Sequence, residues 1–386
     1  MNNIYKTIIV ITLLGYFIIP TQLMAGNRDR SGQAGAQHLL IDPWARSAGW
    51  STVGVAETRG LESIYSNVAG MSFVKKTEVS FSRTQYISGS KAGIGINSAA
   101  ITQHLIKKDK ETGAVRDLGV LGISLFAMTL GDIPITTVEQ PEGNLGFFSP
   151  TLLYIGVHYA KSFNKYIHGG VSGKIINENI SNMSATGFVF DIGVQYLAGA
   201  YENFKIGVTL KNIGLPMRYS GDGLAISVIP TNADHEMTMQ QRSALVEMPS
   251  LLTIGISYDF LFFGEEYANT TKEDMKNTGL TRDNAVHRIT LAGSFTANSY
   301  SRDNFSFGIE YGMQYFMVRA GFLAESGMFK ADTRTTFYSG PSAGVTFAVP
   351  LANKKNGGNQ KLYLDYAYRF LTNWGGNHYV SLKLAL

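Results

Sequence analysis

Several residue types are absent or scarce in this chain, and each absence excludes a class of protein. Cysteine is missing altogether, which excludes disulfides, thiolate metal sites and the cysteine-linked anchor of a lipoprotein. Charged residues make up only 16%, against roughly 25% in an ordinary soluble domain. The net charge of +4 is too small to indicate a nucleic-acid partner, which would require many phosphate contacts. After residue 25 the sequence lacks any apolar run of the roughly 20 residues that a membrane-spanning helix needs.

Glycine and aromatic residues are abundant instead. Glycine occupies 42 of 386 positions, and aromatic residues reach 12%, as 20 Tyr, 22 Phe and 3 Trp. Aromatic residues favour extended strands, and only 10 prolines interrupt the chain. The composition therefore indicates an all-β protein, many of whose side chains meet something other than water.

The N-terminal residues have the pattern of a secretory signal. Lys6 precedes an apolar run over residues 8–19, Pro20 breaks it, and Ala25 offers a small residue at a cleavage point. A single anchoring helix is the alternative, but the run is short and small, polar residues follow it. We therefore expect a cleaved signal peptide over residues 1–25 and a flexible leader over residues 26–38.

From residue 76 onward, apolar residues alternate with small or polar ones in segments of about ten residues. Leu252, Ile254 and Ile256, for example, interleave with Thr253 and Gly255. A period of two places each apolar set on one face of a strand. We count fourteen such segments, at 76–87, 93–105, 117–130, 149–162, 166–178, 185–198, 203–213, 249–261, 286–297, 303–311, 314–323, 339–350, 361–371 and 377–386.

The length of these segments distinguishes a membrane barrel from a soluble sandwich. Soluble strands usually have about 5 to 6 residues, whereas tilted membrane strands need roughly 9 to 11. Aromatic residues near the segment ends, such as Tyr196 and Tyr366, fit the girdles of a transmembrane barrel. An even strand count brings both ends of the strand region to the periplasmic side. Most of the long connections (131–148, 214–248 and 324–338) then lie on the outer side of an outer membrane, whereas two connections that are longer than expected, 106–116 and 262–285, lie on the periplasmic side. Membrane lipid is the expected partner.

No motif indicates an enzyme, a cofactor or a metal site. The residues from Gly340 to Gly344 spell G-x-S-x-G, but a nucleophile elbow needs a following helix, and a strand is expected there. His158 and His168 lie in neighbouring segments, where ordinary polar lumen positions are the better interpretation. Inward-facing acidic residues are expected at Asp191, Asp259, Glu310 and Asp365.

Residues 36–74 read AQHLLIDPWARSAGWSTVGVAETRGLESIYSNVAGMSFV. This block resembles the start of the PorV/PorQ family of Bacteroidetes outer-membrane proteins, which belong to the wider FadL-like barrels. The matching positions form the expected hatch motif: Ala45, Arg46, Ser47, Gly49, Asn67, Ala69 and Gly70. The family's proline after the asparagine is Val68 here.

The resemblance implies a 14-stranded antiparallel barrel over residues 76–386, with an N-terminal hatch over residues 39–75 folded into its lumen. Physical reasoning agrees, because larger barrels are often plugged and residues 39–73 are apolar without alternating strictly. Arg46 would then need a buried acidic partner.

The resemblance also implies a role in type IX protein secretion, with translocon subunits and the C-terminal domains of secreted proteins as partners. Exposed apolar residues in an outer loop would suit such a partner: Met217, Ile226, Val228, Ile229, Met237 and Met239. Equally, these residues could fold over the barrel mouth as a lid. The alternative function is a FadL-type channel for hydrophobic small molecules, with a break in the wall near Gly131, Asp132 and Pro134. A purely structural barrel is a third hypothesis.

Overall fold

A computed structural model describes residues 28–89, 93–108, 115–199, 201–229, 231, 235–264, 282–329, 340–351, 360–371 and 375–386. The expected signal peptide, at residues 1–25, lies outside the described residues. Among the described residues, no helix is long and apolar enough to cross a membrane.

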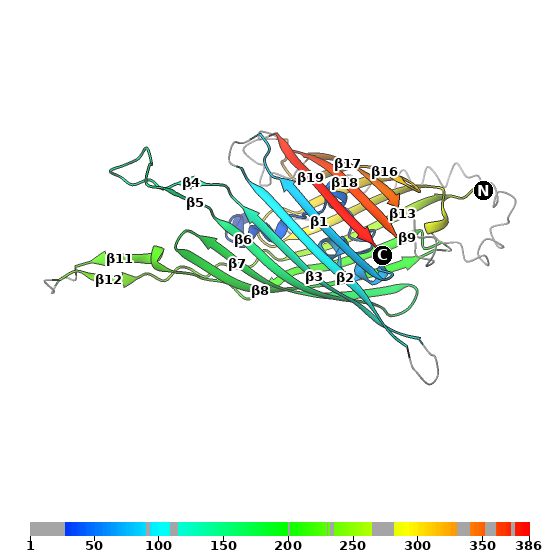
Figure 1. Ribbon diagram of the computed structural model, residues 1–386, viewed down its shortest axis with the longest axis horizontal. Coiled ribbons are helices and arrows are strands. Elements are labelled where there is room, and N and C mark those ends of the chain that lie inside the picture. The colour runs from blue at the N-terminus through cyan, green and yellow to red at the C-terminus, as the bar shows by residue number, and fades with distance from the viewer. Residues whose placement is uncertain are drawn as a thin grey trace.

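Fourteen antiparallel strands form a closed barrel, which confirms the predicted fold class (Figure 1). Each strand pairs with its neighbours along the chain, and pairing of β1 with β19 closes the ring. The strands are β1 (Thr77–Gln85), β2 (Gly95–Lys108), β3 (Val115–Thr129), β6 (Thr151–Ser162), β7 (Ile167–Ile180), β8 (Met183–Ala198), β9 (Phe204–Gly214), β13 (Leu251–Phe262), β14 (His287–Asn298), β15 (Asn304–Met313), β16 (Phe316–Glu325), β17 (Gly340–Pro350), β18 (Lys361–Phe370) and β19 (Gly376–Ala385).

Alternation along each strand separates an apolar exterior from a polar lumen. In β13, Ile254 and Ile256 are 44% and 54% exposed, whereas Thr253, Ser257 and Asp259 are buried inside. The same pattern recurs around the ring, so large apolar side chains cover the outside. A closed barrel with an apolar exterior leaves no unpaired sheet edge in lipid, which is what a membrane-spanning sheet requires.

The connections at the two ends of the barrel differ in length. At one end the chain forms two projecting hairpins, β4 (Ile133–Pro134) with β5 (Phe147–Phe148) and β11 (Ala225–Val228) with β12 (Met237–Gln240), on the left in Figure 1. A short strand, β10 (Tyr219–Ser220), pairs with β8 below the second hairpin. These connections correspond to 131–148 and 214–248, so we call this end the outer end.

The break that the sequence predicts after the third strand marks the end of β3. It does not open a gap in the barrel wall. Gly131 has a φ of 79°, and the residues after it form the β4–β5 hairpin. Within the barrel, β3 stays paired with β2 and with β6 up to Thr129. The gap that the channel hypothesis placed here is therefore not present.

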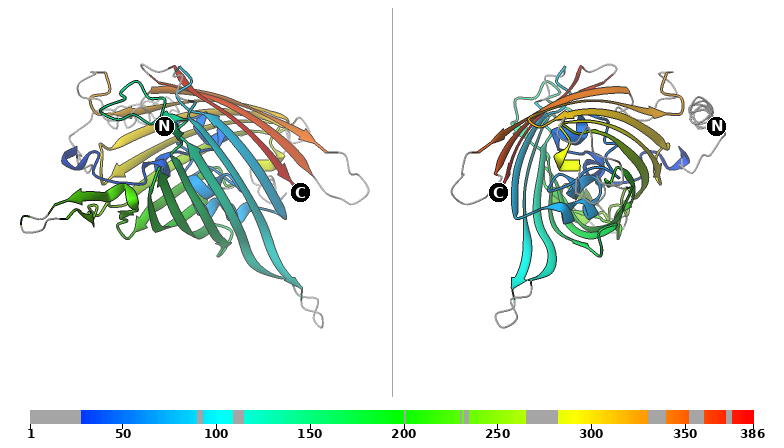
Figure 2. Two further views of the ribbon diagram at one scale, coloured as in Figure 1. Left: turned by 60° about the vertical axis from the view of Figure 1, so that its left-hand side comes forward. Right: turned by 90° about the vertical axis from the view of Figure 1, so that its right-hand side faces the viewer.

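Residues 34–74 occupy the lumen (Figure 2, right, blue). Their short helices are η2 (Gln37–Leu40), α2 (Ala45–Ala48), α3 (Ser63–Ser66) and η3 (Val68–Phe73). Glycines in the wall let this segment approach closely: a Cβ at Gly170 would lie 2.8 Å from the carbonyl carbon of Val68, and one at Gly321 would overlap the backbone of Trp50. Part of the glycine excess in the sequence is thereby explained.

The leader expected to be flexible over residues 26–38 is packed at its C-terminal part. A short 3-10 turn, η1 (Arg28–Arg30), opens the described chain. Ala34 then bridges to Glu247 of the outer connection, and Ala36 and His38 are only 2% exposed. Glycine at position 35 permits this close packing, because a Cβ there would lie only 2.6 Å from the Val246 side chain. The small residues that indicated flexibility are needed for close packing.

Leu291, near the middle of β14 and 45% exposed, tests the assignment of the outward face. A lysine there would place a charge in the bilayer, at a cost of about 2–4 kcal/mol. We expect Leu291→Lys to lower the amount of folded barrel in the outer membrane, measured by heat-modifiable gel migration. Leu245→Lys is the control, since Leu245 lies in an outer connection and is 60% exposed. Equal amounts of both variants would contradict the assignment.

Candidate functional site

The hatch, as we call residues 39–74, contains all seven residues of the expected hatch motif. Six of them are buried, and Arg46 is half-buried. Helix α2 packs against β17, β18 and β19, where the backbone N–H of Ala45 donates to Ser381 Oγ at 3.0 Å. A Cβ at Gly49 would lie 2.9 Å from the Cα of Gly344. The first half of the motif therefore consists of small residues at a close contact with the wall.

Asn67 attaches the second half of the hatch to the wall by hydrogen bonds. Its side-chain amide donates to the carbonyl oxygens of Val55 at 2.9 Å and of Val194, in β8, at 3.0 Å. Its Oδ1 accepts from the N–H of Ala69 at 3.1 Å and caps η3. One asparagine thus joins two parts of the hatch to the barrel. Nearby, Gly70 leaves no room for a Cβ, which would lie 2.8 Å from that of Ser63.

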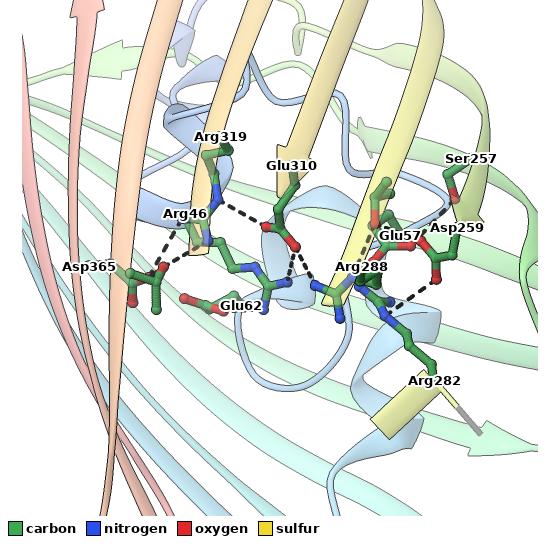
Figure 3. A network of polar contacts seen from close by, with 12 residues as sticks. Arg46, Glu57, Glu62, Ser257, Asp259, Arg282, Arg288, Glu310, Arg319 and Asp365 are labelled. Atoms are coloured by element: carbon green, nitrogen blue, oxygen red, sulfur yellow. Dashed lines mark hydrogen bonds and ion pairs between the residues drawn. The ribbon is translucent and has the colours of Figure 1, made fainter. Parts of the chain in front are cut away.

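One group of buried ion pairs joins the hatch to the periplasmic half of the wall. Glu57, in the hatch, pairs with Lys205 of β9 and with Arg282 of η6 (Arg282–Asn284), as Figure 3 shows for Arg282. Asp259 of β13 accepts from Lys205 Nζ at 2.5 Å and lies 3.4 Å from Arg282 Nε. A carboxylate of the hatch is therefore held by cations from a strand and from a periplasmic connection.

A second group centres on Arg46 and Glu62. Arg46 lies 3.9 Å from Glu62 and 3.6 Å from Glu310 of β15 (Figure 3). Glu62 accepts from Lys383 Nζ of β19 at 2.8 Å, and Glu310 accepts from Arg319 Nε of β16 at 3.0 Å. The predicted need of Arg46 for a buried acidic partner is confirmed, and Glu310 is one of the inward-facing acids expected from the sequence.

The charges in this second group stabilise one another against burial. Burial disfavours the ionised form of Glu62, but Lys383 and Arg46 outweigh it and lower the pKa of that carboxyl. Burial likewise opposes the charge on Arg46, yet Glu310 and Glu62 raise the pKa of the guanidinium. We call Arg46, Glu57, Glu62 and their wall partners the lumen latch. Glu57 and Glu62 are fully buried, so loss of a partner would leave a charge without compensation.

The opposite half of the wall holds the N-terminal segment by stacked rings, apolar contacts and one carboxylate, that of Glu178. His38 stacks on Phe126 of β3 and Tyr154 of β6, with ring centroids 5.8 and 6.3 Å apart. Its Nδ1 lies 3.3 Å from Glu178 of β7, which also accepts from the Tyr219 hydroxyl. The two sides of the lumen therefore differ: one side of the wall holds the hatch by ion pairs, and the other holds the N-terminal segment mainly by ring and apolar contacts.

A cavity of about 540 Å³ lies at the outer end, between the N-terminal segment, the hatch and the strand ends. Val55 and Tyr65 of the hatch line its inner side, and Leu152, Leu251 and Leu323 line it from three strands. The size is within the range of small-molecule sites, which are usually about 300–1,000 Å³.

Charged side chains of both signs line this cavity: the acid Asp42 and the cations Lys211, Arg302 and Arg369. Lys211 of β9 is 6% exposed, and its ammonium lies 3.7 Å from the centroid of the Tyr65 ring. Among the described residues it has no carboxylate within ion-pair distance. Asp42 is 4% exposed; its Oδ1 accepts from the N–H of Trp44 at 3.0 Å, whereas its Oδ2 has no hydrogen-bond partner among the described residues. Burial raises the pKa of Asp42 to about 6.

The loop residues expected to contact a partner divide into two sets. Ile226, Ile229, Met237 and Met239, on or beside the β11–β12 hairpin, are 38–71% exposed, and Val228 is half-buried. Met217 is 2% exposed, because it bridges to Val246 and packs against Ala36 beneath the hairpin. Met217 is therefore not part of the exposed surface of the hairpin.

The remaining polar candidates have structural partners. Asp191, Asp259, Glu310 and Asp365 are all buried in the lumen, as expected. His158 lies between Ser124 and Ser172 at 2.8 and 2.6 Å, and His168 lies near Ser162 and Ser72. Among the described residues no group of three or more His, Asp or Glu could hold a metal. Ser342, of the G-x-S-x-G match, is buried in β17 and bonded to Ser51.

The sequence analysis did not identify the cations that the wall contributes to the lumen latch. Lys205 and Lys383 occupy inward positions between outward-facing apolar residues, so the alternation that found the inward acids also places them. Arg282 carries no such signal, because it belongs to a periplasmic connection.

Glu62 tests the lumen latch. Glu62→Gln would leave Lys383 buried without its carboxylate and Arg46 with Glu310 alone, at a cost of about 3–5 kcal/mol. We expect faster hydrogen–deuterium exchange across residues 45–74, while the strands stay protected. Glu247→Gln is the control, because its pair with Arg30 is exposed and should matter little. Unchanged exchange in Glu62→Gln would contradict the proposed latch.

Asp42 should make the hatch depend on pH. Its carboxyl has a pKa near 6 in the folded chain against an ordinary 3.8, so the folded state binds the proton more tightly. The hatch should lose stability as the pH rises from about 4 to 7, by up to about 3 kcal/mol. Exchange of hatch amides, corrected for intrinsic rate, should be slower at pH 5 than at pH 7.5. Asp42→Asn should reduce that difference, and an unchanged difference would count against this role of Asp42.

No family model matches this chain, and no curated protein matches it. Solved structures similar to it include the CymD monoaromatic hydrocarbon channel, with a TM-score of 0.49, 11% identity, and coverage of 89% of this chain and 97% of that one. The Pseudomonas putida toluene transporter TodX gives a TM-score of 0.48 at 10% identity over 93% and 98%. A Pseudomonas aeruginosa FadL homologue gives 0.47 at 11% over 88% and 97%. Membership of the PorV/PorQ family therefore stays a prediction.

Proposed function

We propose that this chain is a FadL-type channel of the outer membrane that admits small, largely apolar molecules from the outer side. The observation that carries the proposal is the cavity of about 540 Å³ at the outer end. Its inner boundary is the hatch, so a molecule bound there lies directly above the segment that fills the lumen. Such a position suits the first binding step of an uptake channel.

The lining favours a ligand with an apolar body and one acidic group. Aliphatic and aromatic side chains, including Leu152, Leu251 and Tyr300, supply apolar contact. Lys211 offers a buried cation that lies over the Tyr65 ring and forms no ion pair with any described residue, and Arg302 and Arg369 add further cations to the lining. An acid on the ligand would give Lys211 an ion-pair partner, which no described residue provides.

Passage across the membrane requires movement of the hatch. All fourteen neighbouring strand pairs are hydrogen-bonded, and the lumen latch spans much of the interior. Because the wall has no gap beside β3, the route we propose runs through the lumen once the hatch shifts.

Lys211→Met tests the proposal, with Lys165→Met at an exposed periplasmic turn as the control. Purified barrels should retain acidic lipids that mass spectrometry detects in the extract. We expect binding of a fluorescent long-chain acid to weaken about ten-fold in Lys211→Met, equivalent to about 1.4 kcal/mol, and to be unchanged in Lys165→Met. Equal affinity in both variants, with no lipid in the wild-type extract, would refute the channel.

A role in type IX protein secretion is the second candidate. Two observations favour it: the block at residues 36–74 that resembles the PorV/PorQ family, and the exposed apolar residues of the β11–β12 hairpin. Ligand binding and the secretion of proteins to the cell surface, measured on the same variant, distinguish the two functions. Changing Met237 and Met239 to serine should leave ligand binding intact, and loss of secreted proteins from the cell surface in that strain would favour the secretion role.

A further inference from the structure

The outward faces of β18, β19, β1 and β2 carry polar side chains where these strands reach the outer end. The strand register places them side by side: Tyr368 lies opposite His378, which lies opposite Gln85. One step inward, Arg83 of β1 lies opposite Asn97 of β2. We call these residues, with Tyr366, the rim patch. It lies outside the barrel wall, apart from the cavity of the proposed function.

The side chains of the rim patch contact one another across the strands. Tyr366 Oη and His378 Nδ1 are 2.8 Å apart, and the rings of Tyr368 and His378 lie with centroids 4.9 Å apart. The Arg83 guanidinium donates to Asn97 Oδ1 at 2.8 Å. The patch is therefore an ordered polar surface on the membrane side of the barrel.

Two glycines make room for these side chains. A Cβ at Gly95 would lie 2.8 Å from Arg83 Nη2, and a Cβ at Gly376 would overlap the ring of Tyr368. Arg83 therefore lies across β2, and Tyr368 lies across β19. The guanidinium and the aromatic rings are held flat against the wall, where a lipid headgroup would meet them.

Arg83 has a charge without a matching carboxylate. Its guanidinium donates to the neutral amide of Asn97, and no acidic residue in the described part of the chain lies within ion-pair distance. Other outward-facing charges on the strands, Lys107, Arg116 and Lys161, lie at the periplasmic end. A guanidinium facing lipid is tolerated only near the membrane surface, where the groups available to it are lipid phosphates.

We propose that the rim patch binds the phosphate of a phosphorylated glycolipid in the outer leaflet. The planar guanidinium of Arg83 can form two parallel hydrogen bonds to phosphate oxygens. Gln85, Asn97 and His378 supply further polar groups around it, and the Tyr368 ring packs edge-on against Phe370 beside them. The site would fix one lipid beside the β18–β2 wall and does not depend on the proposed function.

The test uses the full-length barrel in vesicles that contain lipopolysaccharide, followed by detergent extraction and native mass spectrometry. Wild type should keep lipopolysaccharide in preference to the same lipid after removal of its phosphates. Arg83→Gln should keep at least five-fold less, and Lys161→Gln, at the other end of the wall, should match wild type. Millimolar inorganic phosphate should not displace the lipid.

Heat-modifiable migration shows whether Arg83→Gln assembles, and the double variant Asn97→Ala with Tyr366→Phe provides a second measurement, expected to weaken retention. Three results would overturn the proposal: equal retention by wild type and the assembled variants, equal retention of phosphorylated and dephosphorylated lipid, or displacement by inorganic phosphate.

Discussion

The burial of charge inside the barrel is the constraint on which the rest of this structure depends. The carboxylates of Glu57 and Glu62 lie in the lumen with almost no exposure to water. They are stable there only because cations from the wall and from a periplasmic connection meet them, as Lys383 meets Glu62 at 2.8 Å. These pairs fix the position of the hatch, and the hatch in turn fixes the cavity above it.

The asymmetry of the lumen follows from the same arrangement. One half of the wall carries the lumen latch. The other half holds His38 and the hatch by stacked rings and apolar contacts, with a few polar contacts such as those of His38 to Glu178 and of Asn67 to Val194. Apolar contacts allow small displacements more readily than a network of paired charges does. We therefore expect any movement of the hatch during transport to begin on the side of β3, β6 and β7, where the cavity meets the N-terminal segment.

Much of the barrel could be predicted, because the alternation of side chains is local. The segment expected at 185–198, for instance, is β8 at Met183–Ala198. The partners inside the lumen could not be predicted, because Arg46 and Glu310 are far apart in the sequence and meet only when the ring closes. The same holds for residues 34–38, whose small side chains indicated flexibility but fit against Met217 and Val246. Local patterns identify the inward residues and leave their pairing undetermined.

The central claim is that a hatch held by buried ion pairs fills the lumen of this barrel. Electrical recording from the purified, full-length barrel in a planar lipid bilayer tests it most directly. A filled lumen predicts no steady open-channel current at neutral pH across a range of voltages. A stable ohmic conductance of the size that an open porin gives would contradict the claim, because ions would then cross a lumen that the hatch should occupy.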